Sequence, residues 1–114
     1  MQARIYLKEG AYGQAREALE SYATARSSGD MNKTIEELKR EINESEAMSQ
    51  KAEKERKSEL WTACVDSSTE ALRGSAWNIK MRETRVECQL RSGDIEGAVG
   101  DLTYAFYYPT RAEY

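Results

Sequence analysis

Gly10-Ala11-Tyr12-x-x-Ala15, Glu59-Leu60-Trp61-x-x-Cys64 and Gly93-Asp94-Ile95-x-x-Ala98 are three versions of one short pattern. Each version opens with a turn residue, continues to a bulky residue and places a small residue three positions later. Cys64 and Ala98 lie 34 residues apart, a period typical of helix–turn–helix units that stack on their neighbours. Ala15 and Cys64 lie 49 residues apart, which is one period plus fifteen residues. The pattern therefore predicts an interrupted array of helical hairpins.

The spacing of apolar residues between turn signals predicts helices at residues 3–9, 11–26, 31–57, 59–73, a fifth after Gly74-Ser75, and 95–107. Gly29 suits the left-handed position that ends the second of these helices. Gly74-Ser75 is expected to end the fourth helix and to cap the fifth. Asp94 is expected to cap the last helix.

The third predicted helix is unusually long. No helix breaker occurs from Met31 to Lys57, so about 27 residues are expected to form one helix of about 40 Å. Its first half carries an apolar stripe, whereas its second half is rich in Lys, Glu and Ser and is expected to be more solvated. The pairs Glu36–Arg40 and Glu53–Lys57 are spaced to interact one turn apart.

Composition narrows the class of protein. The 114 residues suit one domain, and a single proline among many charged residues favours an all-α fold. The net charge is −3 and the basic residues are dispersed, which argues against nucleic-acid binding. No apolar run reaches membrane-spanning length. The absence of histidine removes the commonest general base and metal ligand, so we expect no enzyme activity, no metal and no cofactor.

The three patterns resemble tetratricopeptide repeats, since all three copies carry the small residue that opens the second helix of a repeat. Two copies also match that family at Ala71 and Ala105. The stretches Gly29-Asp30-Met31-Asn32-Lys33, Trp61-Thr62-Ala63-Cys64 and Arg85-Val86-Glu87-Cys88 resemble, more closely, the repeat-bearing J-domain co-chaperones of the endoplasmic reticulum. The J domain itself is expected outside this chain, because its functional tripeptide begins with histidine.

The resemblance implies an all-α, right-handed stack of tetratricopeptide hairpins with one long central helix. Residues 1–114 are then a single repeat-domain fragment. Residues 1–29 hold a partial first repeat, 30–74 the long helix and second repeat, and 75–114 the third repeat.

The resemblance also implies a function. Such a module of a luminal co-chaperone holds or positions unfolded or extended polypeptides for a heat-shock chaperone of the BiP type. The alternative is a structural adaptor that joins folded partner proteins without chaperone activity, and a cytoplasmic location is the alternative to the endoplasmic reticulum lumen. No nucleic acid or membrane partner is expected.

Related repeats clamp a carboxylate in the groove lined by the first helix of each repeat. The equivalent positions here are Glu46, Ser49, Gln50 and Glu53, followed by Lys80, Glu83, Thr84 and Glu87. No asparagine stands at these positions, and the acidic residues are expected to repel a carboxylate. Chaperone tails that end in a carboxylate are therefore disfavoured partners.

Aromatic residues gather near the end of the chain, at Tyr104, Phe106, Tyr107 and Tyr108. They are expected either to cover the end of the repeat array or to form an apolar contact patch for a substrate or a second copy of the chain.

The two cysteines are predicted to face each other. Facing residues of an antiparallel hairpin have position numbers with a nearly constant sum, and a turn at residues 75–77 sets that sum to about 152. Cys64 and Cys88 satisfy it. The alternatives are two buried thiols or a candidate disulfide, which a luminal location would favour.

Overall fold

A computed structural model describes residues 2–25 and 29–107 of the chain. The helices are α1 (Gln2–Glu9), α2 (Tyr12–Ala25), α3 (Gly29–Lys57), α4 (Trp61–Gly74), α5 (Ile79–Ser92) and α6 (Ile95–Tyr107). No strand occurs in these two segments, and the predicted all-α helical repeat fold is confirmed.

In the part of the chain that the structure describes, no helix is both long enough and apolar enough to cross a membrane.

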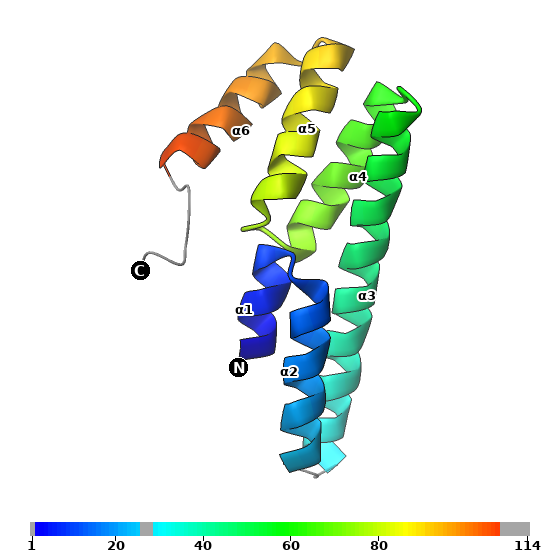
Figure 1. Cartoon of the computed structure of the whole chain (residues 1–114), viewed down its shortest axis with the longest axis vertical. Coiled ribbons are helices and arrows are strands. Elements are labelled where there is room, and N and C mark those ends of the chain that lie inside the picture. Colours follow the sequence, from blue (N-terminus) through cyan, green and yellow to red (C-terminus); the bar gives the residue numbers. More distant parts are fainter. Residues whose placement is uncertain (1, 26–28, 108–114) are drawn as a thin grey trace.

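The helices form three successive hairpins, α1–α2, α3–α4 and α5–α6, in an elongated molecule of 50 × 31 × 18 Å. Helix α2 lies along the first half of α3, and α4 lies along its second half (Figure 1). The long helix α3 therefore belongs to both halves of the molecule and fixes how they sit relative to each other.

The prediction of one continuous long helix is confirmed. Helix α3 has 29 residues, which corresponds to about 43 Å. The prediction for Gly29 is wrong, because this residue begins α3 and the positive-φ glycines of the described segments are Gly10 and Gly93. The expected side-chain pairs four residues apart are replaced by Lys39–Glu36 at 3.7 Å and Arg56–Glu53 at 2.9 Å, each three residues apart.

Helix α4 begins at Trp61 and not at Glu59 as predicted. Glu59 has a φ of 60°, and its amide and that of Leu60 donate to carbonyls in the last turn of α3. A left-handed residue of this kind ends a helix and satisfies its carbonyls. The Glu59–Leu60 segment therefore closes α3, and α4 starts only after it.

Helix α5 begins four residues later than Ser75. The amide of Ser75 donates to the carbonyl of Ala71 as the C-cap of α4, so the predicted end of α4 at Gly74-Ser75 is confirmed, whereas the predicted capping of α5 by the same pair is wrong. The cap of α5 is Asn78, whose side chain accepts a hydrogen bond of 3.1 Å from the amide of Met81. The predicted cap at Asp94 is confirmed, since its carboxylate accepts from the amide of Gly97 at 3.1 Å.

The buried apolar residues form two clusters, one in each half. The first joins α1, α2 and the first half of α3 through Ala3, Leu7, Tyr12, Ala15, Leu19, Ile35, Leu38 and Ile42. The second joins the remainder of α3 to α4 and α5 through Ala52, Ala71, Leu72 and Met81. Helix α6 lies at the predicted position, and Ile95, Val99 and Leu102 on it are more than half exposed.

Candidate peptide-binding groove

A groove with a volume of about 1010 Å³ runs along α3 between the α1–α2 turn and the start of α5. Its lining residues come from these three regions and from one residue of α6. They are Glu9, Gly10, Ala11, Tyr12, Glu46, Ser49, Gln50, Glu53, Lys54, Lys57, Trp77, Asn78, Ile79, Lys80, Met81 and Tyr104. Six of these side chains are apolar or aromatic and come from different elements, which is the composition of a site for an apolar ligand group.

One wall of the groove depends on a close contact between distant turns. Gly10 has a φ of 80°, and a Cβ atom at this position would lie 2.2 Å from Nδ2 of Asn78. Only glycine avoids both the backbone strain and the clash. The amide of Trp77 donates to the carbonyl of Lys8 at 2.7 Å, and the Lys8 ammonium lies 5.0 Å from the centre of the Trp77 ring. These contacts hold the α4–α5 connection against the first hairpin.

A buried cluster of hydroxyl groups supports the groove from beneath. The hydroxyl of Tyr12 lies 3.0 Å from Ser45 Oγ, 2.7 Å from Ser49 Oγ and 3.2 Å from Ser75 Oγ. Ser45 and Ser75 also donate to the carbonyl of Ala71. The cluster lies between the two apolar clusters and joins α2, α3 and the end of α4. Removing one of these hydroxyl groups would leave the others short of a hydrogen-bond partner, and a buried hydroxyl without a partner is destabilising.

The acidic side chains on α3 are paired with arginines. Arg16 donates to Glu46 at 2.5 Å, and the carboxylate raises the pKa of Arg16. Arg56 donates to Glu53 at 2.9 Å and also approaches Glu87 at 3.4 Å. The hydrogen bond from Arg56, with a further one from the neighbouring threonine of α5, lowers the pKa of Glu53 against the opposing effect of burial. Each of these carboxylates therefore has an arginine partner within the protein.

Three lysines of the lining stand apart from those pairs. Lys54 and Lys57 lie in the last turn of α3, and Lys80 lies at the start of α5; all three are exposed. None of them forms an ion pair within residues 2–25 and 29–107, although Lys80 is near enough to Glu53 to contribute to its lowered pKa. Cationic side chains at this end of the groove thus remain open to a ligand.

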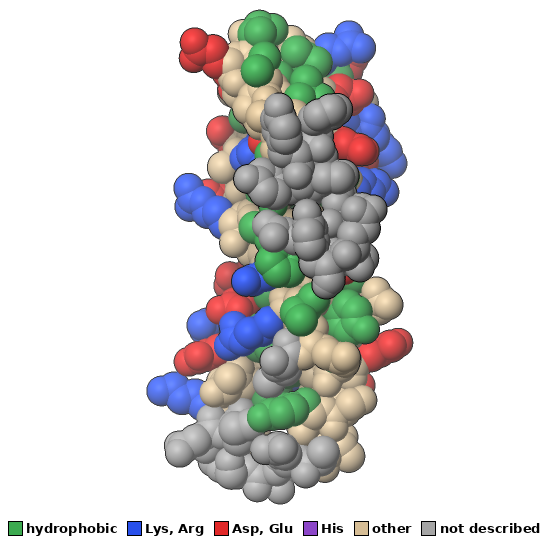
Figure 2. All heavy atoms as spheres, turned by 90° about the vertical axis from the view of Figure 1, so that its left-hand side faces the viewer, with side chains coloured by type: hydrophobic (Ala, Val, Ile, Leu, Met, Phe, Trp, Pro, Cys, Tyr) green, Lys and Arg blue, Asp and Glu red, His purple; other side chains and the backbone are tan. Residues whose placement is uncertain are grey.

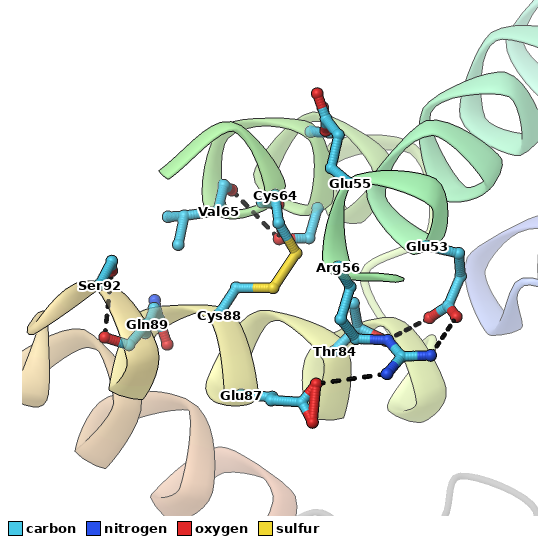
Figure 3. The surroundings of a disulfide bond; sticks show 12 residues. Glu53, Glu55, Arg56, Cys64, Val65, Thr84, Glu87, Cys88, Gln89 and Ser92 are labelled. Atoms are coloured by element: carbon cyan, nitrogen blue, oxygen red, sulfur yellow. Dashed lines mark hydrogen bonds and ion pairs between the residues drawn. A yellow bond between two sulfur atoms is a disulfide. The ribbon is translucent and has the colours of Figure 1, made fainter. Parts of the chain in front are cut away.

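Cys64 and Cys88 join α4 to α5 behind the groove. Their sulfur atoms are bonded at 2.01 Å, their Cα atoms lie 6.0 Å apart and both residues are fully buried. Figure 3 shows the side chain of Arg56 next to the bond, with its guanidinium group reaching away to Glu53 and Glu87. The disulfide therefore fixes α5 against α4 about two turns beyond Ile79–Met81, the part of α5 that lines the groove.

A buried carboxylate holds α6 on α5. Asp101 is 4% exposed and accepts hydrogen bonds from Arg82 at 3.0 Å and from Arg85 at 2.5 and 2.6 Å. Arg82 also lies 3.8 Å from the centre of the Tyr104 ring, an arrangement that a cation–π interaction favours. This contact places Tyr104 at the edge of the groove.

The predicted aromatic patch is described only at Tyr104, which is half-buried and lines the groove. The side chains of Phe106 and Tyr107, and Tyr108 as a whole, lie outside the described residues. The exposed apolar residues near the α5–α6 turn are instead Leu90, Ile95, Val99 and Leu102. Figure 2 shows apolar side chains gathered at this end of the molecule.

Sequence reasoning found part of the groove. Glu46, Ser49, Gln50, Glu53 and Lys80 line it, as the comparison with clamp positions predicted, whereas Glu83, Thr84 and Glu87 do not. The prediction that its acids repel a carboxylate did not foresee their arginine partners. It also missed Lys54, Lys57 and the Trp77–Ile79 segment. The spacing of two lysines three residues apart on one helix is the signal that could have identified the first two.

The described residues contain no group of three or more His, Cys, Asp or Glu side chains placed to hold a metal ion. Their chemistry is that of apolar contact, hydrogen bonding and charge.

Comparison with known proteins gives one informative similarity. The chain is 33% identical over 101 residues to a tetratricopeptide repeat and J domain-containing co-chaperone of Cryptococcus neoformans var. grubii. The match covers 89% of this chain and 19% of that protein, so the chain spans about a fifth of the relative's length. No family model and no solved structure matches the chain. The similarity supports the resemblance to co-chaperones that combine tetratricopeptide repeats with a J domain.

Proposed function

We propose that this chain is the protein-binding repeat module of a luminal co-chaperone, and that it holds or positions unfolded polypeptides for a heat-shock chaperone. It acts as a binding module and not as an enzyme. The J domain of such a protein lies outside these residues and recruits the chaperone.

The groove carries the proposal. Its lining combines apolar and aromatic side chains with hydrogen-bonding groups, and it follows α3 from Glu46 to Lys57, about 16 Å at the rise of an α-helix. An extended chain advances about 3.3 Å per residue, so the groove accommodates about five residues of extended polypeptide. The similarity to a repeat-bearing co-chaperone agrees with this use of the surface.

A binding assay with a permanently unfolded protein tests the function. A fluorescently labelled, reduced and carboxymethylated protein should bind the chain in an anisotropy titration, whereas the same protein in its folded form should not. Ile79→Ser removes an apolar group from the groove at a position where serine suits the first turn of a helix, and it should weaken binding. Val99→Ser is the matched control, because Val99 is exposed on α6 outside the groove. Equal affinity for folded and unfolded forms would refute the proposal.

The adaptor alternative makes the opposite prediction. A scaffold that joins folded proteins should ignore the unfolded probe and retain one folded partner.

The luminal location is part of the proposal and is supported by the buried Cys64–Cys88 bond, because disulfides persist in oxidising compartments. Protease digestion of microsomes from the source cells, followed by detection of the protein with an antibody, tests the location. The protein should resist digestion until detergent opens the vesicles. Digestion without detergent would favour the cytoplasmic alternative.

A further inference from the structure

We propose that the groove is selective for extended segments in which acidic residues flank an apolar residue, with the acidic end toward the carboxyl end of α3. This inference rests on the proposed function and names the class of polypeptide that the same groove prefers.

The first step is the charge that the groove leaves uncompensated. Glu46 and Glu53 are each bonded to an arginine that does not line the groove, Arg16 and Arg56. Arg16 balances Glu46, and Arg56 is shared between Glu53 and Glu87, so the protein itself compensates most of the acidic charge beside the groove. The remaining lining charges are three lysines and Glu9.

The second step is the distribution of these charges along the groove. Lys54 and Lys57 are three residues apart and so lie on the same face of α3, in its last turn. Lys80 faces the groove from the start of α5. Glu9 lies at the opposite end, beside the α1–α2 turn. The groove is thus electrically polar along its length, with its basic end at the carboxyl end of α3.

The third step is the apolar surface between those ends. Trp77, Ile79 and Tyr104 are half-buried and present part of their surface to the groove. Tyr104 is held there by Arg82, and Trp77 by its contacts with Lys8. Because these rings are fixed before a ligand arrives, little ordering is needed to bind an apolar side chain of an extended segment.

The local charge outweighs the net charge of −3 at this surface. Exposed charges farther away than about 8 Å are largely screened at physiological ionic strength, so a ligand in the groove interacts mainly with the lysines that line it. Acidic residues near Lys54 and Lys57 should strengthen binding, and salt should reduce that gain.

The experiment uses three fluorescent peptides of equal length with one central leucine. The first peptide carries Glu residues on one side of the leucine. The second carries Ser at the same positions, and the third carries Lys there. Anisotropy titrations at low and physiological salt should give an affinity for the acidic peptide about fivefold above the neutral one and a still lower affinity for the basic one. The difference should diminish as salt is added.

Lys54→Ser/Lys57→Ser should abolish this order, and Lys54→Glu/Lys57→Glu should reverse it in favour of the basic peptide. Lys33→Ser/Lys39→Ser is the matched control, because it removes the same charge from exposed positions on the first half of α3. Circular dichroism and thermal unfolding should show that each variant keeps the fold.

The outcomes separate the inference from the function on which it rests. Equal affinity for all three peptides, together with binding of the unfolded protein probe, overturns the charge selectivity and leaves the proposed function standing. An equal loss in the Lys33/Lys39 control assigns the effect to net charge and also overturns the selectivity. Failure of all three peptides and of the unfolded protein probe refutes the proposed function itself.

Discussion

Reduction of the Cys64–Cys88 bond should cause a large loss of stability. The two residues are fully buried and 24 positions apart, and they join α4 to α5. A cross-link of this kind restricts the unfolded chain, and the chain-entropy relation gives about 3.4 kcal/mol at 25 °C for a loop of that length. Since small domains are stable by only about 5–15 kcal/mol, this is a substantial share of the total.

Urea denaturation of the same protein with and without a thiol reductant measures the contribution directly. The two samples have identical side chains and differ only in the bond. With an m-value of about 1.5 kcal/mol/M, the midpoint should fall by about 2 M on reduction. The Cys64→Ala/Cys88→Ala variant is the control, and its midpoint should not respond to the reductant.

Two results would refute this reasoning. The first is the detection of two reactive thiols in the denatured, unreduced protein, which would show that the bond is absent. The second is a change of less than about 1 kcal/mol in the free energy of unfolding when the protein is reduced and its thiols are then blocked so that the bond cannot re-form. That result would show that the bond does not restrict the unfolded chain as the entropy relation assumes.

Three further substitutions test other parts of the structure. Tyr12→Phe removes the hydroxyl that joins three buried serines and should cost about 1–2 kcal/mol in urea denaturation, whereas Tyr6→Phe, at a half-buried position, should cost less than half of that. Asp101→Asn leaves two arginines without their carboxylate and should cost about 3 kcal/mol and speed amide exchange in α6, while Asp66→Asn at an exposed site should have little effect. Glu53 has a lowered pKa in the folded state, so its carboxylate stabilises the fold at pH values above its unfolded pKa of about 4.3. This contribution is lost as the pH falls through the folded pKa. In urea denaturation, the stability advantage of the wild type over Glu53→Gln should therefore shrink in that acidic range.

The sequence predicts a turn or a helix end correctly where that feature depends on residues only a few positions away. The turn at Gly10, the cap at Asp94 and the unbroken run of α3 all follow from side chains within a few positions. The α4–α5 connection was misplaced because its position depends on distant contacts. Helix α4 ends at Gly74 as predicted, but the amide of Trp77 donates to the carbonyl of Lys8 on the first helix, and the connection continues to Asn78 before α5 begins.

The buried serines show a different limit. Polar composition predicted that the second half of α3 is solvated, yet Ser45 and Ser49 are buried. A small hydroxyl fits a helix interface when a partner reaches it, and the partner here is Tyr12, 33 and 37 residues away. Residue type alone does not reveal this, because the groups that bond these serines, Tyr12 and the end of α4, are far away in the sequence.

Charge in the groove depends on the same kind of distant pairing. The sequence of α3 alone predicts an acidic surface, because Glu46 and Glu53 each lie about one helical turn from Gln50 and so share its face. Arg16, the partner of Glu46, stands on α2, where the spacing of α3 does not reveal it, and Arg56, three residues after Glu53, does not line the groove. The sign of the field that a ligand meets is therefore set by residues that never touch it. It follows that repeats with identical groove-lining residues can differ in charge preference when only the arginines behind the groove differ.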